Sequence, residues 1–223
     1  MTGTVAVTGA AGALGRKVVE VLAGAGWKVV GIDLADVPQG SAALAVGGID
    51  LTSEDAVGRA ATQIEQTFGG LDGLVNVAGG FSWETIGGGA VSTWDKLYAM
   101  NVKTALVTSR ALLPLLKASK GSIVNIGAAA SAKAAMGMGA YAASKAGVAR
   151  LTEALAEELK DEHVRVNAIL PSIIDTPANR ADMPDAEFDR WVSPEQLASV
   201  IAFLLSPGAS AVTGALVPVT GRV

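Results

Sequence analysis

A tyrosine and a lysine four residues apart, Tyr141 and Lys145, are the pair in this sequence best suited to acid–base chemistry. They lie in the helical-looking segment YAASK, and side chains at i and i+4 project from one face of a helix. A phenol normally titrates near 10, and an ammonium group ~4 Å away favours its anion by about 4 kcal/mol at an effective dielectric constant near 20. We expect this charge to outweigh desolvation and to leave Tyr141 usable in proton transfer near neutral pH. Alone, such a pair could equally be an ordinary surface pair.

A second group of residues could bind a nucleotide. The segment VTGAAGALG places Gly9, Gly12 and Gly15 between a predicted strand and a predicted helix. Such a turn lets the backbone approach a pyrophosphate and aims helix N-terminal N–H groups at its negative charge. By itself, a glycine-rich turn is also compatible with a tight turn of no such function.

Acidic residues after the next strands strengthen the nucleotide hypothesis. Asp33 ends the second predicted strand, eighteen residues after Gly15. A carboxylate there can accept both ribose hydroxyls of an adenosine and would repel a 2′-phosphate, so NADH is preferred, while Arg16 leaves NADPH use possible. The alternative is that Asp33 only caps the following loop. Asp50, after the third strand, can accept a hydrogen bond from the exocyclic amine of adenine.

Short apolar segments alternate with longer helical ones, and this order predicts the scaffold. Strand-like segments such as GTVAVTG, GSIVNIGA and VRVNAILP are apolar on both faces and are followed by helical segments. That pattern is typical of a parallel sheet covered on both sides. We expect one domain over residues 1–223, an α/β fold with a doubly wound, Rossmann-type parallel sheet of about seven strands. Ligands of such sheets bind beyond the carboxyl ends of the strands, where all these residues fall.

The composition excludes several function classes. The 223 residues carry a net charge of −4 with scattered lysines and arginines, no cysteine, and one histidine, His163, at a charged turn. We therefore expect no nucleic-acid partner, no thiol chemistry and no metal site. The apolar runs are shorter than the ~20 residues that cross a bilayer, and no leader precedes the first strand. These features predict a soluble, cytoplasmic protein with no membrane partner.

Taken together, these segments resemble the short-chain dehydrogenase/reductase family over essentially the whole chain. The resemblance rests on VTG and the glycines at 8–15, Asp33, Asp50, NVAG at 76–79, AMNV at 99–102, GSIVNI at 121–126, YAASK, RVNAILP at 165–171, DTP at 175–177 and VTG at 212–214. It implies that Tyr141 moves a proton, that Lys145 tunes it and holds the nicotinamide ribose, and that Asn101 supports a water relay. The implied cofactor contacts are Gly9, Ala11, Gly12, Ala13, Leu14, Gly15, Asp33, Leu34, Asp50, Leu51, Asn76, Ala78, Gly79, Gly80, Tyr141, Lys145, Pro171, Ile174 and Thr176.

One family feature is missing. The family's usual catalytic serine stands thirteen residues before the tyrosine, and that position is Ala128 here. Ser131 is ten residues before Tyr141, so we expect a loop serine unless the loop bulges. From Gly127 to Trp191 the sequence is similar to the quinonoid dihydropteridine reductases, NADH-dependent enzymes that also lack this serine. A ring nitrogen in a conjugated substrate develops less charge on one oxygen than a ketone does, so it can dispense with the serine donor.

These observations predict an NADH-dependent oxidoreductase that transfers a hydride to a small, planar substrate. Asn76 and Asn101 follow the broader family, so an enzyme acting on a ketone/alcohol pair is one alternative, and a non-catalytic nucleotide-binding protein is another. The predicted pocket residues are Phe81, Trp83, Ala128, Ser131 and Trp191, below a substrate lid at about 176–194. Helical segments at 99–118 and 141–160 are apolar around much of their circumference, which suggests a homodimer or homotetramer.

Overall fold

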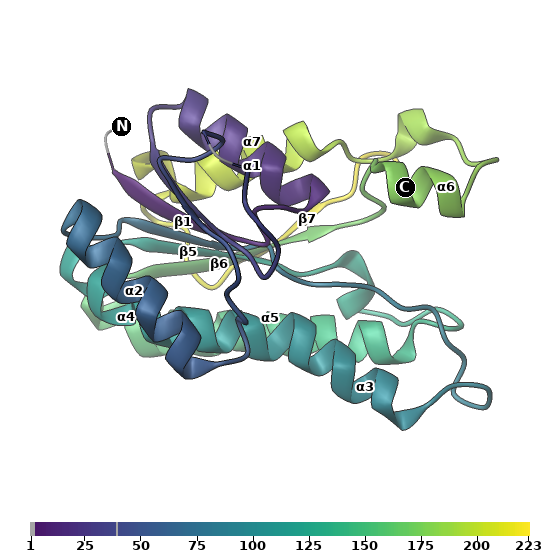
Figure 1. Ribbon diagram of the computed structural model, residues 1–223. Helices are drawn as coiled ribbons and strands as arrows, with labels where there is room; N and C mark the ends of the chain where they lie inside the picture. The colour runs from purple at the N-terminus through teal and green to yellow at the C-terminus, as the bar shows by residue number, and fades with distance from the viewer. Residues whose placement is uncertain (1–2, 39) are drawn as a thin grey trace.

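The computed structural model describes residues 3–38 and 40–223 and contains a seven-stranded sheet with helices on both faces (Figure 1). All strand pairs are parallel, in the order β3-β2-β1-β4-β5-β6-β7. The strands are β1 Thr4–Thr8, β2 Lys28–Ile32, β3 Leu44–Val46, β4 Gly73–Asn76, β5 Ser122–Ile126, β6 Arg165–Pro171 and β7 Leu216–Val219. The predicted fold class and strand number are confirmed. The strand order reverses between β1 and β4, which is where such sheets bind ligands.

Helices form the two outer layers. In Figure 1, α1 and α7 lie on one face of the sheet, and α2, α4 and α5 lie on the other. The helices are α1 Ala13–Gly24, α2 Glu54–Phe68, α3 Val91–Tyr98, α4 Thr104–Ser119, α5 Gly139–Leu159, α6 Pro177–Asp182 and α7 Pro194–Leu205. Among the described residues, no helix combines the length and apolarity needed to cross a bilayer.

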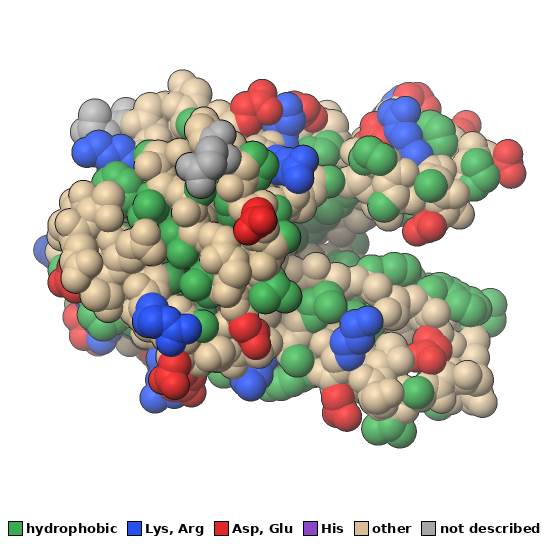
Figure 2. All heavy atoms as spheres, in the orientation of Figure 1, with side chains coloured by type: hydrophobic (Ala, Val, Ile, Leu, Met, Phe, Trp, Pro, Cys, Tyr) green, Lys and Arg blue, Asp and Glu red, His purple; other side chains and the backbone are tan. Residues whose placement is uncertain are grey.

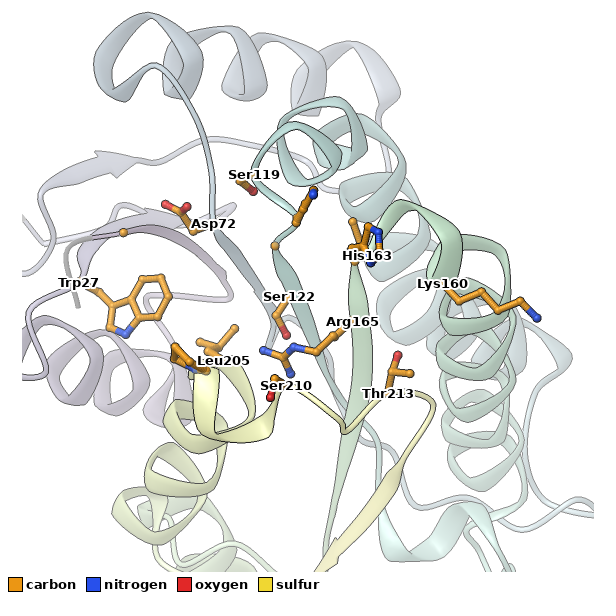
Figure 3. A pocket seen from close by; sticks show the side chains of 15 residues that line it. Trp27, Asp72, Ser119, Ser122, Lys160, His163, Arg165, Leu205, Ser210 and Thr213 are labelled. Atoms are coloured by element: carbon orange, nitrogen blue, oxygen red, sulfur yellow. The ribbon is translucent and has the colours of Figure 1, made fainter.

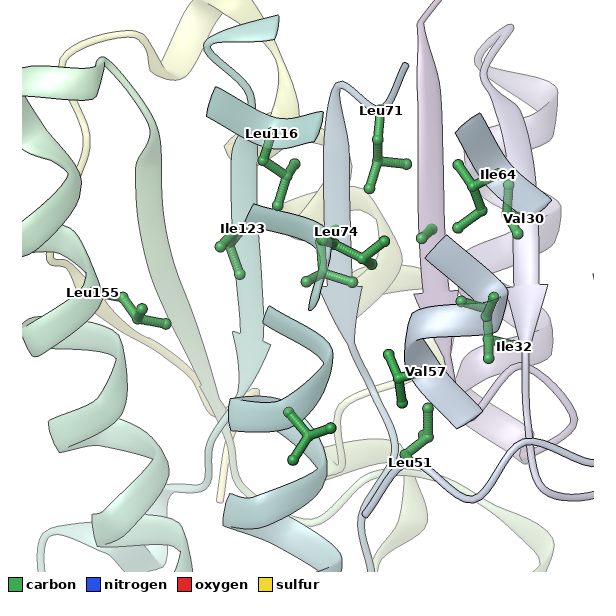
Figure 4. Close-up of a cluster of buried hydrophobic side chains, with 14 of the residues drawn as sticks. Val30, Ile32, Leu51, Val57, Ile64, Leu71, Leu74, Leu116, Ile123 and Leu155 are labelled. Atoms are coloured by element: carbon green, nitrogen blue, oxygen red, sulfur yellow. The ribbon is translucent and has the colours of Figure 1, made fainter. Parts of the chain in front are cut away.

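Apolar side chains fill the space between each layer and the sheet. Figure 4 shows the cluster beneath α2 and α4, where Ile64, Leu74 and Ile123 are fully buried. A second cluster on the other face includes Val18 and Ile201, from α1 and α7. Each buried side chain of this size contributes roughly 1.5–3 kcal/mol. The sheet is therefore held from both sides, and the carboxyl ends of its strands form a fixed platform.

The long apolar segment before β5 is interrupted. Residues Val91–Tyr98 form α3, residues Ala99–Lys103 form a single turn of π-helix, and α4 follows directly. A π turn inserts one residue into the helical repeat and is frequent at functional sites. This turn carries Asn101.

Candidate active site

The carboxyl ends of the strands open into a notch. Figure 2 shows it between an arm that contains α6 and an arm that contains α3. The glycine turn after β1 meets the loop after β4, where a Cβ on Gly9 would lie 2.8 Å from the Ala78 nitrogen, and that loop meets the start of α5, where a Cβ on Gly79 would lie 3.4 Å from Lys145 Nζ. The residues predicted for the cofactor and for catalysis therefore come together at this end of the sheet.

Two glycines of the first turn have no room for a side chain. Gly9 has a φ of +65°, and a Cβ there would lie 2.8 Å from the Ala78 nitrogen. A Cβ on Gly15 would lie 2.0 Å from the Gly9 carbonyl oxygen. Gly12 is less constrained, because its Cβ would be 3.3 Å from that oxygen. Among the described residues no side chain caps the start of α1, so its first N–H groups have no side-chain partner there.

Asp33 stands beside this turn. Its Oδ2 accepts a hydrogen bond from the Ala11 nitrogen at 2.9 Å, and its Oδ1 accepts one from the Ala35 nitrogen at 3.0 Å. The carboxylate thus orders its own loop, and each oxygen keeps a second lone pair for another donor. The two roles considered for Asp33 are compatible, and its contact with a ribose stays a prediction.

The loops after β3 and β4 differ in what they offer. Asp50 accepts hydrogen bonds from the Thr52 nitrogen and hydroxyl at 2.8 and 2.7 Å, which lower the pKa of its carboxyl group. The Leu51 side chain is buried in the core, so only its backbone is available to a ligand. After β4, the Thr8 hydroxyl accepts from the nitrogens of Val77 and Ala78 at 3.1 and 3.2 Å. Thr8 belongs to the VTG segment, but its place in the sequence alone predicts no role for it.

Lys145 is buried at the start of α5. Its side chain is 6% exposed, and its Nζ donates to the Ile126 carbonyl oxygen at 2.8 Å. Burial lowers the pKa of this ammonium group to about 8. A Cβ on Gly79 would lie 3.4 Å from the same Nζ and 2.6 Å from Asn101 Oδ1. The end of β4, the π turn and α5 therefore converge at one point.

Tyr141 does not titrate as the sequence predicted. Its ring meets that of Phe81 edge to face, with the ring centroids 4.9 Å apart. Burial raises the pKa of the phenol to about 12. The expectation that the lysine charge outweighs desolvation is wrong, because Lys145 is itself desolvated and its ammonium group is directed at the Ile126 carbonyl. Near neutral pH, Tyr141 is therefore a protonated phenol.

Asn101 is fixed by its neighbours. Its Oδ1 accepts from the Gly80 nitrogen at 2.8 Å, and its Nδ2 donates to the Ser144 hydroxyl at 2.8 Å. Ser144 in turn donates to the Tyr141 carbonyl oxygen at 2.7 Å. Ser144 is a site residue that sequence reasoning did not identify, although its place in YAASK, one residue before Lys145, was a usable signal.

Ala128 and Ser131 lie at the two ends of one short turn. Ala128 is the second residue after β5, is 4% exposed and precedes a 3₁₀ turn over Ala129–Ser131. The Ser131 nitrogen donates to the Ala128 carbonyl oxygen at 3.0 Å. A 3₁₀ turn advances only about 6 Å over three residues. Ser131 therefore lies closer to Ala128 than its separation in sequence suggests.

The aromatic residues predicted for the pocket differ in exposure. Trp83 packs on Gly137, where a Cβ would lie 2.1 Å from the indole, and the Glu84 nitrogen donates to the Gly137 carbonyl oxygen at 2.8 Å. Phe81 and Trp83 are about half exposed; Phe81 meets Tyr141 of α5, and Trp83 joins the loop after β4 to the loop before α5. Trp191 is only 7% exposed and packs edge-on against Phe188. Its ring therefore packs mainly within the predicted lid and leaves little surface for a ligand.

A second hollow of about 690 Å³ lies at the amino ends of the strands, away from these residues (Figure 3). Its wall includes Trp27, Asp72 and Arg165. Arg165 donates to the carbonyl oxygens of Leu204 and Ser206 at 2.7 and 3.3 Å, so it anchors the end of α7. His163, with a φ of +60°, is in the turn before β6, where the sequence placed it.

The NAD(H) assignment fits this architecture. Gly9, Gly15 and Gly79 form surfaces from which any side chain is excluded, next to an uncapped helix start and a buried lysine. A dinucleotide needs close backbone approach at its pyrophosphate and donors at its ribose. These residues supply both.

Comparisons with known proteins agree with this geometry. Residues 3–187 match the family described as short chain dehydrogenase. The chain is 32% identical over 241 residues to 2-(S)-hydroxypropyl-CoM dehydrogenase 3 of Xanthobacter autotrophicus, covering 97% of this chain and 94% of that protein. It is 29% identical to the 3-oxoacyl-(acyl-carrier-protein) reductase FabG of Thermotoga maritima, covering 96% and 95%. The structure of 3-ketoacyl-(acyl-carrier-protein) reductase from Brucella melitensis complexed with NADH superposes with a TM-score of 0.89 at 28% identity, covering 99% of this chain and 98% of that one.

Proposed function

The chain belongs to the short-chain dehydrogenase family and is an NAD(P)-dependent oxidoreductase, and we propose that it uses NADH to reduce a small, planar substrate in the manner of a dihydropteridine reductase. The cofactor would be held by the glycine turn after β1, by Asp33, by the loop after β4 and by Lys145. Bound NADH supplies the hydride. Asp33 supports NADH over NADPH, because its carboxylate would repel a 2′-phosphate.

Tyr141 acts as the proton donor. With a pKa of about 12 its phenol is protonated near neutral pH, which suits a step that delivers a proton to a reduced substrate. The Lys145 ammonium group, whose pKa of about 8 keeps it mostly charged at pH 7, would hold the nicotinamide ribose. Asn101 and Ser144 hold the start of α5 against the π turn and so keep Tyr141 in position. This protonated state is the one that proton delivery to a reduced substrate requires.

The proposal of a planar substrate rests on the methyl group of Ala128. This methyl group is buried two residues after the end of β5, at the position where the family usually has a serine. A ketone develops an alkoxide that a hydroxyl donor stabilises, and loss of such a donor typically costs ~10²–10³ in rate. A conjugated ring that accepts a hydride spreads its charge and needs this donor less.

The test is NADH oxidation with a panel of substrates and two variants. Wild type should reduce a quinonoid dihydropterin faster than simple ketones such as ethyl acetoacetate. Ala128→Ser should leave pterin reduction within about threefold and raise ketone reduction by about tenfold, because it restores part of the donor. The proposal fails if wild type reduces the ketone at a kcat/KM at least equal to that for the pterin.

A ketone or alcohol substrate is the second candidate, and one specific observation favours it. Ser131 is a single 3₁₀ turn from Ala128, so its hydroxyl could replace the missing one. In that case Ser131→Ala should abolish ketone turnover without changing the melting temperature. Under the planar-substrate proposal the same change is nearly silent.

A further inference from the structure

The predicted lid is acidic. Residues 176–194 contain four acidic and two basic side chains, a net charge of −2, and Asp175 directly before them brings this to −3, whereas the whole chain has a net charge of −4. This segment forms α6 and the 3₁₀ turn Phe188–Arg190. It makes up the arm that faces α3 across the notch, and Figure 2 shows acidic side chains over that arm.

The first arginine of the lid is already engaged. Arg180 donates through Nε and Nη2 to the two carboxylate oxygens of Asp175, at 2.6 and 2.8 Å. Its guanidinium group also lies over the Phe188 ring, 4.7 Å from the centroid. A bidentate, stacked guanidinium group is held in a fixed geometry, so Arg180 is not available to an incoming anion.

The second arginine is engaged with the chain's C-terminal residues. Arg190 donates to Glu187 Oε2 at 2.9 Å and to the Arg222 carbonyl oxygen at 2.8 Å. Arg222 donates to Asp189 Oδ2 at 2.7 Å, and its backbone nitrogen donates to the Arg190 carbonyl oxygen at 3.0 Å. Arg190 and Arg222 thus each form hydrogen bonds to the backbone of the other and to one carboxylate. Asp182 and Asp185 take part in no ion pair among the described residues.

The opposite wall of the notch is apolar and balanced in charge. Phe81 and Trp83, after β4, and Met136, before α5, expose more than half of their surface. An apolar hollow of about 290 Å³ lies beside them, between residues 84–86 and 134–139. Over 81–86 and 128–139 the charged side chains are Glu84 and Lys133, which cancel.

We infer that the substrate of this enzyme is uncharged and apolar beyond its reacting ring, and that the lid discriminates against substrates that carry a carboxylate or a phosphate. An anion entering the notch meets a wall with net negative charge and no uncommitted arginine, while an apolar substituent finds exposed aromatic surface opposite. This inference deepens the proposed function by naming the substrate class of the same site. It rests on that proposal only in assuming that residues 175–190 cover the substrate.

The experiment compares two planar substrates that differ in charge. Quinonoid dihydropterins bearing a methyl group or a carboxylate at ring position 6 are assayed with NADH at about 10 mM ionic strength. We expect kcat/KM for the methyl compound to exceed that for the carboxylate by about fivefold to tenfold, with the difference shrinking at about 0.5 M salt because salt screens exposed charges. Equal values overturn the inference and leave the proposed function standing. If neither pterin is reduced, the proposed function fails, and ethyl acetoacetate against acetoacetate makes the same charge comparison.

Variants assign the effect to the lid. Asp182→Asn combined with Asp185→Asn removes two lid carboxylates and should reduce the preference for the uncharged substrate at least threefold. The matched control, Asp55→Asn combined with Glu65→Gln, makes the same charge change on α2 and should leave the preference unchanged. An equal response in both double variants would mean that net charge, rather than the lid, sets the preference, and would overturn the assignment.

Discussion

The two halves of the site are built by different means. The nucleotide half, after β1 and β4, consists mainly of backbone, and its shape depends on positions where a Cβ has no room, such as Gly9 and Gly15. The catalytic half, around α5, depends on side chains that are removed from water, Lys145 and Tyr141, whose pKa values are moved by burial. Ligand binding by the nucleotide half should therefore be sensitive to added side-chain atoms and independent of pH. The catalytic half should tolerate small changes of side-chain volume, and its stability and activity should depend on protonation.

This contrast separates what each half contributes. Rigid backbone surfaces recognise an invariant ligand, and their hydrogen bonds do not titrate in the physiological range. Buried ionisable groups destabilise the fold because their charged forms lose hydration. Keeping them is a cost in stability that the chemistry requires. Four measurements test this contrast.

The largest effect is expected at Tyr141. Tyr141→Phe keeps the ring packed against Phe81 but removes the proton, so turnover should fall by ~10²–10⁴. NADH affinity, measured by fluorescence titration, should change little. An unchanged turnover number would assign the proton to another group, with Ser131 the first to examine.

A smaller but still large effect is expected at Gly15. A methyl group there would lie 2.0 Å from the Gly9 carbonyl oxygen, so the turn must shift and NADH should bind at least about 100-fold more weakly, since the phosphate site depends on that turn. Gly12→Ala is the matched control, because its Cβ is 3.3 Å from the same oxygen at an ordinary φ of −75°. Equal losses in the two variants would contradict a shape-based site.

The free energy of unfolding tests the role of burial in the catalytic half, at Lys145. Its pKa falls from 10.5 to about 8 on burial. Between these values the unfolded chain binds a proton that the folded chain has released, so the free energy of unfolding should rise with pH, by about 2 kcal/mol from pH 8 to 10.

Lys145→Met should remove this slope. At pH 7 it should be more stable than wild type by about 1–2 kcal/mol, since the desolvated charge costs about 3 kcal/mol and the bond to Ile126 offsets part of it. Turnover should be lost. Urea denaturation at pH 7, 8 and 10 measures both effects, and a wild-type protein with no slope would refute the burial argument.

The smallest effect is expected at Asp33. Wild type should bind NADH at least about tenfold more tightly than NADPH, and Asp33→Ala should bring that ratio close to one, because the carboxylate that repels a 2′-phosphate is gone. Asp36→Ala, an exposed acid in the same loop, is the control and should keep the wild-type ratio. A ratio near one in the wild type would remove the argument from Asp33.

The fold and most of the site could be predicted because they are local in sequence. The strands are recognisable in the sequence as apolar segments. The glycine turn, Asp33 and the Tyr141–Lys145 pair occur at short sequence distances from them. What could not be predicted depends on three-dimensional burial. The pKa of Tyr141 depends on how deeply Lys145 is packed and on which carbonyl its ammonium group meets. The proximity of Ser131 to Ala128 depends on a 3₁₀ turn with no distinctive residues, and the engagement of Arg190 with Arg222 joins positions 32 residues apart.

The π turn at Ala99–Lys103 has a consequence for the length of the chain. Such a turn is one residue longer than the α-helical repeat, so deleting a single residue there would restore a regular helix from α3 through α4. The deletion would also rotate everything before it by about 100° relative to α4, and Asn101 would lose its place beside Gly80 and Ser144. The number of residues between α3 and α4 therefore fixes the place of Asn101, and a chain one residue shorter here would keep a continuous helix without this part of the site.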